Sequence, residues 1–454
     1  MRSTSVSAEK AASPAFYSVR QRLTLVLLFA GISAVHFLTA WLPGPAPNMG
    51  GRTSEYYPLL TDAFLAGRTS LLVEPDPRLL ALPDPYDEVA NKPYRLHDTS
   101  LYKGKYYLYF GPAPVLVLFL PYKLLTGSHL PTRAAVAVFS IAGYACSCAL
   151  FFLLIRRLKW QCPFWLAAAA VTSLGTSSLV YFLVRRASFY EAAIASAYCM
   201  AAAGFLTLAH GLRPSSPNRM WLLFSGLCFG LTAGCRPSFA LVAAFMAIAV
   251  SLRLIANKTR ALVFVLPVVI CGAVLAWYNY ERFDNPLDFG VRYQLSSSKA
   301  DVEAHYGRGI GPIFPALYEL LLGAPVTDIH YDPKMGLLRA APIALLGICA
   351  PLFLWRYRTW FIDGHSTAFI AWCLYATAAG MLALLAAMDF VIGRYQVDFA
   401  PEFALLAWLV LCGIWTEVRT WPGIRLRLIQ ATAVIATLYS AFIDLGGSLS
   451  RIRG

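Results

Sequence analysis

Charged side chains are scarce in this chain. Asp, Glu, Lys and Arg together make up 14% of its 454 residues, whereas hydrophobic residues make up 58% and the mean hydropathy is +0.58. Stretches without charge repeatedly reach the roughly 18 to 20 residues that a helix needs to cross a bilayer. This composition excludes a water-soluble globular protein and indicates an integral membrane protein.

Several features of other protein classes are also missing. The long polar segments 43–110 and 281–337 contain no cysteine, which excludes an ectodomain held together by disulfides. There is no internal repeat, low-complexity tract, Gly-rich phosphate loop or credible Ser/His/Asp arrangement. His305, Asp328 and His330 lack the spacing of a zinc site.

What the chain does contain is a series of apolar runs. Because lipid offers the backbone no hydrogen-bond partners, runs of this kind must be helical. They predict an all-α polytopic membrane protein with about eleven transmembrane helices. The first run exceeds the apolar core of a signal peptide and ends in Leu-Pro-Gly-Pro, so we expect it to remain as a helix. The runs free of Asp, Glu, Lys and Arg cover 23–51, 134–155, 163–184, 192–212, 220–235, 237–252, 261–280, 340–355, 366–388, 403–416 and 428–443.

Basic residues predict the orientation. Those before residue 23 place the N-terminus in the cytoplasm and the segment after residue 42 outside. The later basic clusters, among them 156–159 and 419–427, are cytoplasmic only if 111–125 does not cross. Its length of about fifteen residues and its three prolines favour an interfacial or re-entrant helix.

The net charge of +14 follows from this orientation. In the two long outer segments acidic residues outnumber basic ones, so the positive excess lies on the inner loops. We therefore expect a lipid bilayer, and no nucleic acid, as the partner of the basic residues.

The first outer segment opens with Ser54-Glu55-Tyr56-Tyr57. Glu55 is a candidate general base; the alternative is that it caps the following helix. Asp62 lies seven residues further on, about two helical turns, and could share a face with Glu55 or be a solvated position. Tyrosine offers a sugar ring a flat apolar face and a hydroxyl, although some rings suit an interfacial aromatic belt instead. The candidate sugar or acceptor contacts are Tyr56, Tyr57, Asp98, Tyr102, Tyr106, Tyr107 and Tyr395.

A second acid, Glu191, stands directly before an uncharged run. An ionisable group so near hydrocarbon needs a partner or a task, and a salt bridge with Arg185 or Arg186 is the simpler explanation. Arg186, Arg236 and Arg394 lie on the predicted outer side, against the usual charge bias. They are candidates for binding a phosphate, or they extend toward lipid headgroups; Asp398 could pair with Arg394.

The order of these features resembles that of the GT-C glycosyltransferases, a family that includes protein O-mannosyltransferases and lipid A aminoarabinose transferases. The resemblance rests on an acid just past the first helix, on LLTDAFLAG (59–67), on YKGKYYLYFGPAPVLVLFLPYKLLTG (102–127) and on a helix ending in Arg-Arg-Leu (156–158), and more weakly on the helix pattern to about residue 260 and on Arg394-Tyr395. Members commonly carry Asp-Glu or Asp-Asp at the first acid, whereas here Ser54 precedes a lone Glu55.

The resemblance implies an inverting hexosyl- or pentosyltransferase in a bacterial inner membrane, which moves a sugar from a polyprenyl-phosphate donor to a periplasmic glycan, lipid or protein. Glu55, Asp62 and Glu191 would be catalytic, and a divalent cation between the acids stays open. The expected parts are a cytoplasmic tail (1–22), a GT-C-like membrane module (23–280) with a periplasmic loop (43–131), a second periplasmic loop (281–337) with a short helix near 316–322, and C-terminal membrane helices (338–454).

Two other classes remain compatible with the sequence. A ligase or polymerase of lipid-linked glycans would also be polytopic with a large outer loop, and would use a lipid diphosphate donor. A transporter or flippase would instead place polar groups at mid-membrane. The apolar runs hold almost no charge at their middles, which favours an enzyme acting at the membrane surface.

Overall fold

The computed structural model describes residues 17–42, 55–213, 218–296, 313–324, 335–356, 365–388, 392–418 and 423–449. Within these ranges the fold is helical, as expected, apart from a hairpin of β1 (Ser100–Tyr102) and β2 (Lys105–Tyr107). Ser54, which precedes the candidate base, lies outside the described residues, as do His305, Asp328 and His330.

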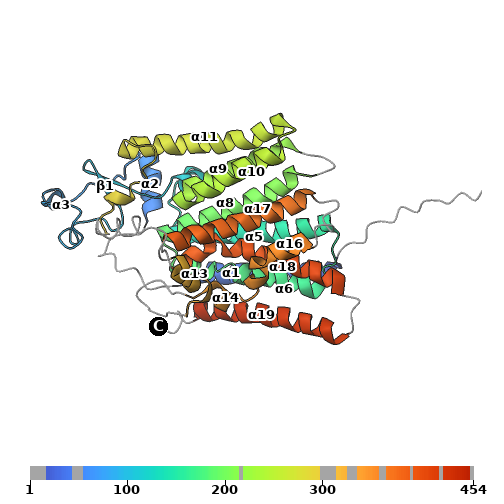
Figure 1. Cartoon of the computed structure of the whole chain (residues 1–454). Helices are drawn as coiled ribbons and strands as arrows, with labels where there is room; N and C mark the ends of the chain where they lie inside the picture. The colour runs from blue at the N-terminus through green and yellow to red at the C-terminus, as the bar shows by residue number, and fades with distance from the viewer. Residues whose placement is uncertain are drawn as a thin grey trace, which may run out of the picture.

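The long helices run side by side in one bundle (Figure 1). Seven described helices are long and apolar enough to cross a membrane, so the chain is a multi-pass membrane protein. They are α1 (Val19–Trp41), α5 (Thr132–Leu158), α8 (Phe189–Gly211), α11 (Lys258–Phe283), α17 (His365–Ala387), α18 (Ala400–Val418) and α19 (Gly423–Leu449).

The other predicted runs form shorter helices, so the expected count of about eleven crossings is not settled. Run 163–184 is divided where Leu179 has a φ of 60°, a left-handed conformation that ends a helix. Prolines interrupt run 340–355. The shorter elements are α6 (Phe164–Thr176), α7 (Tyr181–Arg186), α9 (Arg219–Cys235), η2 (Pro237–Phe239), α10 (Ala240–Arg253), α14 (Leu337–Ala340), α15 (Ala344–Ile348) and α16 (Ala350–Arg356).

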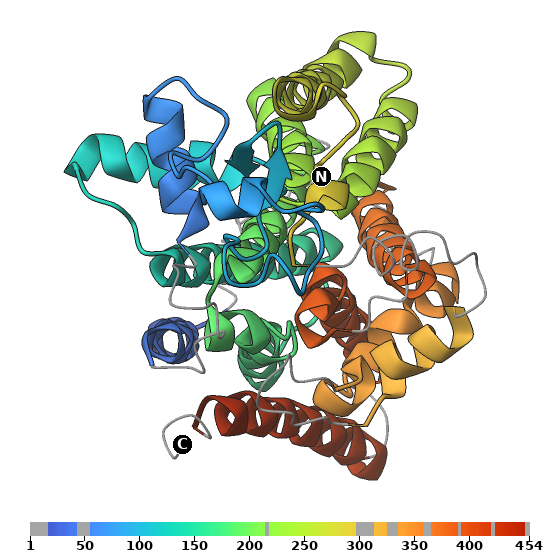
Figure 2. The same ribbon diagram turned by 90° about the vertical axis from the view of Figure 1, so that its left-hand side faces the viewer.

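The segment between α1 and α5 gathers at one end of the bundle, on the left of Figure 1, and lies across that end in Figure 2. It contains α2 (Tyr56–Leu65), α3 (Pro77–Leu80), the hairpin, the π-helical η1 (Val115–Phe119) and α4 (Leu120–Thr126). The apolar stretch 115–126 is too short to cross a bilayer. We call this end of the molecule the loop end.

Two close contacts attach this segment to the bundle. A Cβ built on Gly111 would lie 2.2 Å from the carbonyl oxygen of Gly234, so only glycine allows the loop to approach the end of α9 so closely. The fully buried Arg282, at the end of α11, donates a hydrogen bond to the carbonyl of Leu108. Both contacts place the loop beside the last turns of α9 and α11.

The segment after α11 returns to the same loop. Leu295 donates its N–H to the carbonyl of Thr99 at 3.1 Å, and the Ser100 hydroxyl donates to the carbonyl of Gly290 at 2.8 Å. This segment includes η3 (Val291–Tyr293), and the short helix expected near 316–322 is confirmed as α13 (Ile313–Leu322). The loop end is therefore built from two parts of the chain that are far apart in sequence.

Candidate functional site

Three arginines predicted from sequence come together at the loop end. Arg186 ends α7, Arg236 links α9 to η2, and Arg394 lies in η5 (Gly393–Asp398). Arg186 and Arg394 stack over the ring of Tyr190 at 5.3 and 4.7 Å. Arg394 and Arg236 stack over the ring of Tyr395 at 5.4 and 4.1 Å. The result is a row of guanidinium groups and aromatic rings, which we call the arginine cluster.

Glu191 joins this cluster from the first turn of α8 and has no exposed surface. Its Oε2 accepts a hydrogen bond from the Ser188 N–H at 3.1 Å, completing a capping box at the helix start. Its Oε1 lies 3.3 Å from Nη1 of Arg394 and 4.0 Å from Nε of Arg186. The expected ion pair with Arg186 is therefore present, but Arg394 is the nearer partner.

Asp398 pairs with Arg236, and not with Arg394 as the spacing of four residues suggested. The 3-10 geometry of η5 explains the difference, because side chains three apart eclipse and residues four apart no longer share a face. Burial raises the pKa of Asp398 to about 6, although Arg236 opposes the shift. Guanidinium groups gathered in this way match the oxygens of an anionic ligand such as a phosphate.

Aromatic rings of the first loop cover the cluster. The ring of Tyr56 packs edge-on against Phe189 at 4.6 Å, and Phe110 packs against Phe189 and Tyr190, each at 6.0 Å. Phe189 and Tyr190 immediately precede Glu191, so these contacts attach the loop to the first turn of α8, where the buried carboxylate lies. Such a cover excludes water and strengthens the electrostatic interactions beneath it.

Glu55 lies at the start of α2 but its side chain does not cap that helix. Its Oε2 instead accepts hydrogen bonds from the N–H and the hydroxyl of Thr132, at 2.9 and 2.6 Å. Thr132 is the first residue of α5, so the carboxylate sits at the N-terminus of that helix. Its neighbour Tyr56 packs against Phe189, which precedes Tyr190 and Glu191 in α8.

Asp62 binds Lys123 and His129, near α4, and not Glu55. Its carboxylate binds Lys123 and lies 2.8 Å from Nε2 of His129. Partial burial alone would raise the pKa of Asp62, but the hydrogen bonds from Lys123 and His129 outweigh it and lower the pKa. Asp62 therefore links α2 to α4 as part of an ionic group.

Asp98 has a φ of 52°, a left-handed conformation that is uncommon outside glycine. Its N–H donates to the hydroxyl of Ser296 at 2.6 Å, and the same hydroxyl lies 3.1 Å from Nδ1 of His97. Burial lowers the pKa of His97, and Arg186 is among the charges that lower it further. The His97–Asp98 turn thus lies within electrostatic reach of the arginine cluster.

Most of the predicted tyrosines form the core of the loop. Tyr57 and Tyr106 are 0% and 1% exposed, and neither presents a ring face for a sugar in this conformation. Tyr107 packs against Phe283 at 5.4 Å, and the Tyr102 hydroxyl donates to Asp284 at 2.7 Å. Tyr395, which is only partly buried, is the predicted tyrosine that stacks with the arginines.

The predicted acids do not converge on a cation site. Glu55 binds Thr132, Asp62 binds Lys123 and His129, and Glu191 faces arginines. Within the described ranges, no group of three His, Cys, Asp or Glu side chains is placed to hold a metal. The described acids therefore offer no shared set of ligands for a divalent cation.

The sequence alone did not identify Glu402, in the first turn of α18. Asp398 Oδ1 and Glu402 Oε2 are buried and have no hydrogen-bond partner among the described residues. Buried oxygens of this kind usually mark a place where water or a ligand donates hydrogen bonds. A usable signal was present: Glu402 is an acid inside the apolar stretch that follows Asp398.

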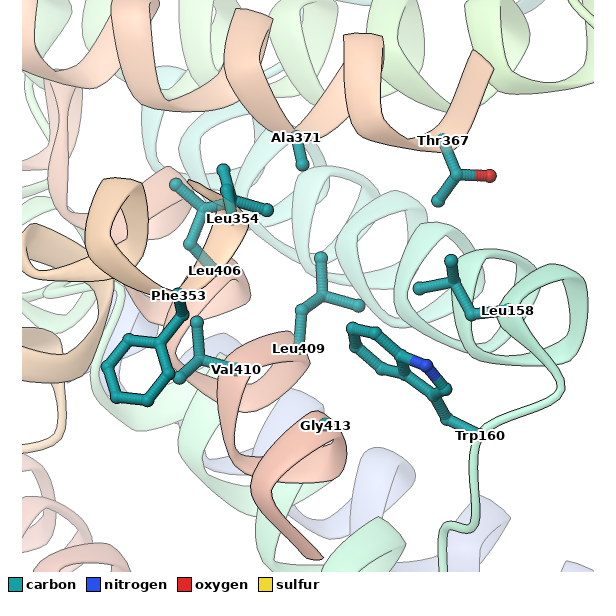
Figure 3. Close-up of a pocket in the computed structure, with 10 residues that line it drawn as sticks. All are labelled: Leu158, Trp160, Phe353, Leu354, Thr367, Ala371, Leu406, Leu409, Val410 and Gly413. Atoms are coloured by element: carbon teal, nitrogen blue, oxygen red, sulfur yellow. The ribbon is translucent and has the colours of Figure 1, made fainter. Parts of the chain in front are cut away.

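An apolar hollow between α5, α16, α17 and α18 is unrelated to the cluster (Figure 3). Its volume of about 20 Å³ suffices for little more than one water molecule. Trp160, Phe353 and Leu409 are among its lining residues, and Thr367 supplies the hydroxyl visible in Figure 3. With so few polar groups, this hollow is a packing defect and not a site for polar chemistry.

No protein-family model and no curated protein sequence matches the chain. Among solved structures, the fold is similar to the oligosaccharyltransferase of Archaeoglobus fulgidus in its apo form, with a TM-score of 0.51 and 14% identity over 95% of this chain and 56% of that one. ArnT from Cupriavidus metallidurans bound to undecaprenyl phosphate aligns with a TM-score of 0.47 and 13% identity, over 96% of this chain and 77% of that one. This chain therefore shares the fold of the archaeal oligosaccharyltransferase.

Proposed function

We propose that this protein is an inverting membrane glycosyltransferase that moves a sugar from a polyprenyl phosphate to an acceptor hydroxyl. The observation that supports this most is the arginine cluster. Arg186, Arg236 and Arg394 come from separate segments, yet they stack on two shared rings at one end of the bundle. Guanidinium groups suit phosphate because their planar donors match its oxygens.

The buried carboxylates give the cluster a fixed geometry. Glu191 holds Arg394 and Asp398 holds Arg236, so the guanidinium planes are oriented before any ligand arrives. Orientation of this kind reduces the cost of binding and places positive charge where the departing phosphate gains negative charge. In the proposal Glu191 positions an arginine, while Asp62 acts at a distance by holding α2.

Glu55 is the proposed base. Both of its hydrogen bonds to Thr132 use Oε2, and within the described part of the chain Oε1 is left to receive a proton from the acceptor. The acceptor oxygen would attack the anomeric carbon while the bond from that carbon to the phosphate oxygen breaks. Glu55 would take the hydroxyl proton, and the polyprenyl phosphate would leave with the electron pair.

The sidedness of the reaction is part of the same proposal. The loop end would lie in the periplasm, and the ends with basic loops in the cytoplasm of a bacterial inner membrane. The loop residues 43–131 and 281–337 would then form the acceptor side, with Tyr395 and the His97–Asp98 turn nearest the sugar. A glycan, a lipid or a protein could present the hydroxyl.

A transfer assay tests the role of Glu55. Protein in lipid nanodiscs would receive a mixture of radiolabelled polyprenyl-phosphate sugars and a membrane extract as acceptor. Glu55→Gln keeps an oxygen for Thr132 but cannot take a proton, so we expect a loss of about 10²-fold or more. Glu74→Gln is the matched control, because Glu74 is an exposed acid of the same loop. Equal activity of the two variants would remove Glu55 from the reaction.

The same assay separates donor classes. A polyprenyl diphosphate oligosaccharide, supplied in place of the monophosphate sugar, tests for a glycan ligase or polymerase. Exclusive use of the diphosphate donor would contradict the monophosphate proposal while leaving the base assignment intact.

A further inference from the structure

A second basic site lies at the opposite end of the bundle. A cavity of about 220 Å³ is bounded by the last residues of α8 and α10 and the first residues of α9, α11 and α17. Its lining includes Arg213, Arg253, Arg260 and Ser366. We propose that this cavity binds the phosphate of an anionic phospholipid, in the membrane leaflet away from the loop end.

The charge of the wall is of one sign. The described residues that line the cavity include three arginines and no carboxylate. Arg260 lies in the first turn of α11, where no acid is present, so its charge stands at the positive end of the helix dipole. Like charges gathered in one hollow repel each other, and a bound anion would relieve this repulsion.

Helix ends add donors to the same hollow. α11 and α17 both begin at the cavity, with Arg260 and Ser366 in their first turns. The Asn257 side chain already accepts the Arg260 N–H at 3.2 Å. The N–H groups before Arg260, and those at the start of α17, have no partner within their helices and favour phosphate oxygens. Guanidinium groups, a hydroxyl and helix N-termini together form a site suited to a phosphodiester.

The surroundings indicate a lipid as the source of the phosphate. The lining includes Leu212, Leu222 and Leu254, which suit the glycerol and upper acyl carbons. Beside the cavity, Leu252 and Ile255 are 64% and 69% exposed, and Leu262 on α11 is 64% exposed. These apolar side chains would face acyl chains in a membrane, directly next to the basic hollow.

The cavity is separate from the arginine cluster. Glu191 and Gly211 occupy the two ends of α8, which at 1.5 Å per residue lie about 30 Å apart. Basic residues at this end also agree with the charge bias of cytoplasmic loops. That bias requires only positive charge on one side, however, and does not explain why three arginines line one cavity.

Native mass spectrometry of the full chain tests the proposal. The protein would be released from micelles containing equal amounts of phosphatidylglycerol and phosphatidylcholine with identical acyl chains. The cavity variant is Arg253→Gln with Arg260→Gln. The control is Arg156→Gln with Arg219→Gln, which removes the same charge from exposed positions outside the cavity lining. Elution volume and thermal unfolding would establish that both variants are folded.

We expect the wild-type chain and the control to retain phosphatidylglycerol, and the cavity variant to lose about tenfold or more of it, since each basic residue near an anionic lipid contributes several-fold in affinity. Equal retention by the two variants would overturn the proposal. So would equal retention of both lipids by the wild-type chain. Displacement of the lipid by millimolar inorganic phosphate alone would instead indicate a site for free phosphate, which also contradicts a lipid site.

Discussion

Arginines at the two ends of the helix bundle differ in burial and in hydrogen bonding, and α11 carries one of each kind. At the loop end Arg282 is fully buried, with its guanidinium bonded to the Leu108 carbonyl and to Asn279 Oδ1. At the other end Arg260 is only partly buried and lines an open cavity. A buried guanidinium must be satisfied by the protein itself, whereas one at a cavity wall is available for a ligand.

The arginine cluster lies between these extremes. Arg236 and Arg394 are each 7% exposed, but they are held by Asp398 and Glu191 and lie over aromatic rings. Their partners fix the direction of each guanidinium. The comparison supports the two proposals made above, a defined anion at the loop end and a looser attachment to lipid at the opposite end.

The largest effect should follow from Glu191→Gln. The amide still accepts the hydrogen bonds from Ser188, but Arg394 loses its buried counter-charge. We expect the free energy of unfolding to fall by about 3 kcal/mol and transfer to be lost. Thermal unfolding in detergent and the transfer assay measure both. Glu417→Gln, at an exposed position of α18, should change stability by less than about 1 kcal/mol. Equal effects would mean that Glu191 does not organise the cluster.

A smaller effect distinguishes the two ends of α11. Arg282 bonds the Leu108 carbonyl and Asn279 through two different nitrogens, and the single ammonium nitrogen of lysine cannot occupy both positions. Arg282→Lys should therefore lower the free energy of unfolding by about 2 kcal/mol. Arg260→Lys keeps the charge at a partly exposed position and should cost less than about 0.5 kcal/mol. Thermal unfolding of the two variants measures the difference. If both cost the same, the contrast between a guanidinium bonded within the protein and one that lines a cavity is wrong.

The smallest effect concerns pH. Because the pKa of Asp398 is raised to about 6, this carboxyl takes up a proton as pH falls through 6, and Arg236 then loses its ionised partner. The neutral carboxyl still accepts the hydrogen bond that orients Arg236 but no longer competes with a phosphate for its charge. The affinity for a polyprenyl phosphate should therefore rise, by up to about tenfold, between pH 7 and 5 relative to Asp398→Asn. The variant supplies the reference because the lipid phosphate itself titrates near pH 6. The measurement is the affinity of both proteins for a polyprenyl phosphate at several pH values. Identical pH profiles would show that the protonation of Asp398 does not affect phosphate binding.

The sequence was informative where a charged residue occurs at a position that normally disfavours charge. Charges beside apolar runs on the predicted outer side pointed to Arg186, Arg236, Arg394 and Glu191, and the structure brings these four together. The helical class could likewise be predicted because lipid leaves the backbone few alternatives.

Pairings and ring orientations could not be predicted in the same way. Asp398 binds Arg236, from which 162 positions separate it, and Glu55 binds the start of α5 instead of capping its own helix. Tyr57 and Tyr106 became core residues because a loop of this size needs an apolar interior of its own. Such contacts depend on tertiary packing, which local spacing does not record.

One binding measurement tests the central claim most directly. Undecaprenyl phosphate and undecaprenol share a hydrocarbon chain and differ only in the phosphate, so their affinity ratio isolates the headgroup. We predict that the wild-type chain prefers the phosphate by at least about tenfold, equivalent to about 1.4 kcal/mol, and that Arg236→Gln with Arg394→Gln abolishes the preference. Equal affinity of the wild-type chain for both lipids would show that the arginine cluster does not bind a lipid phosphate.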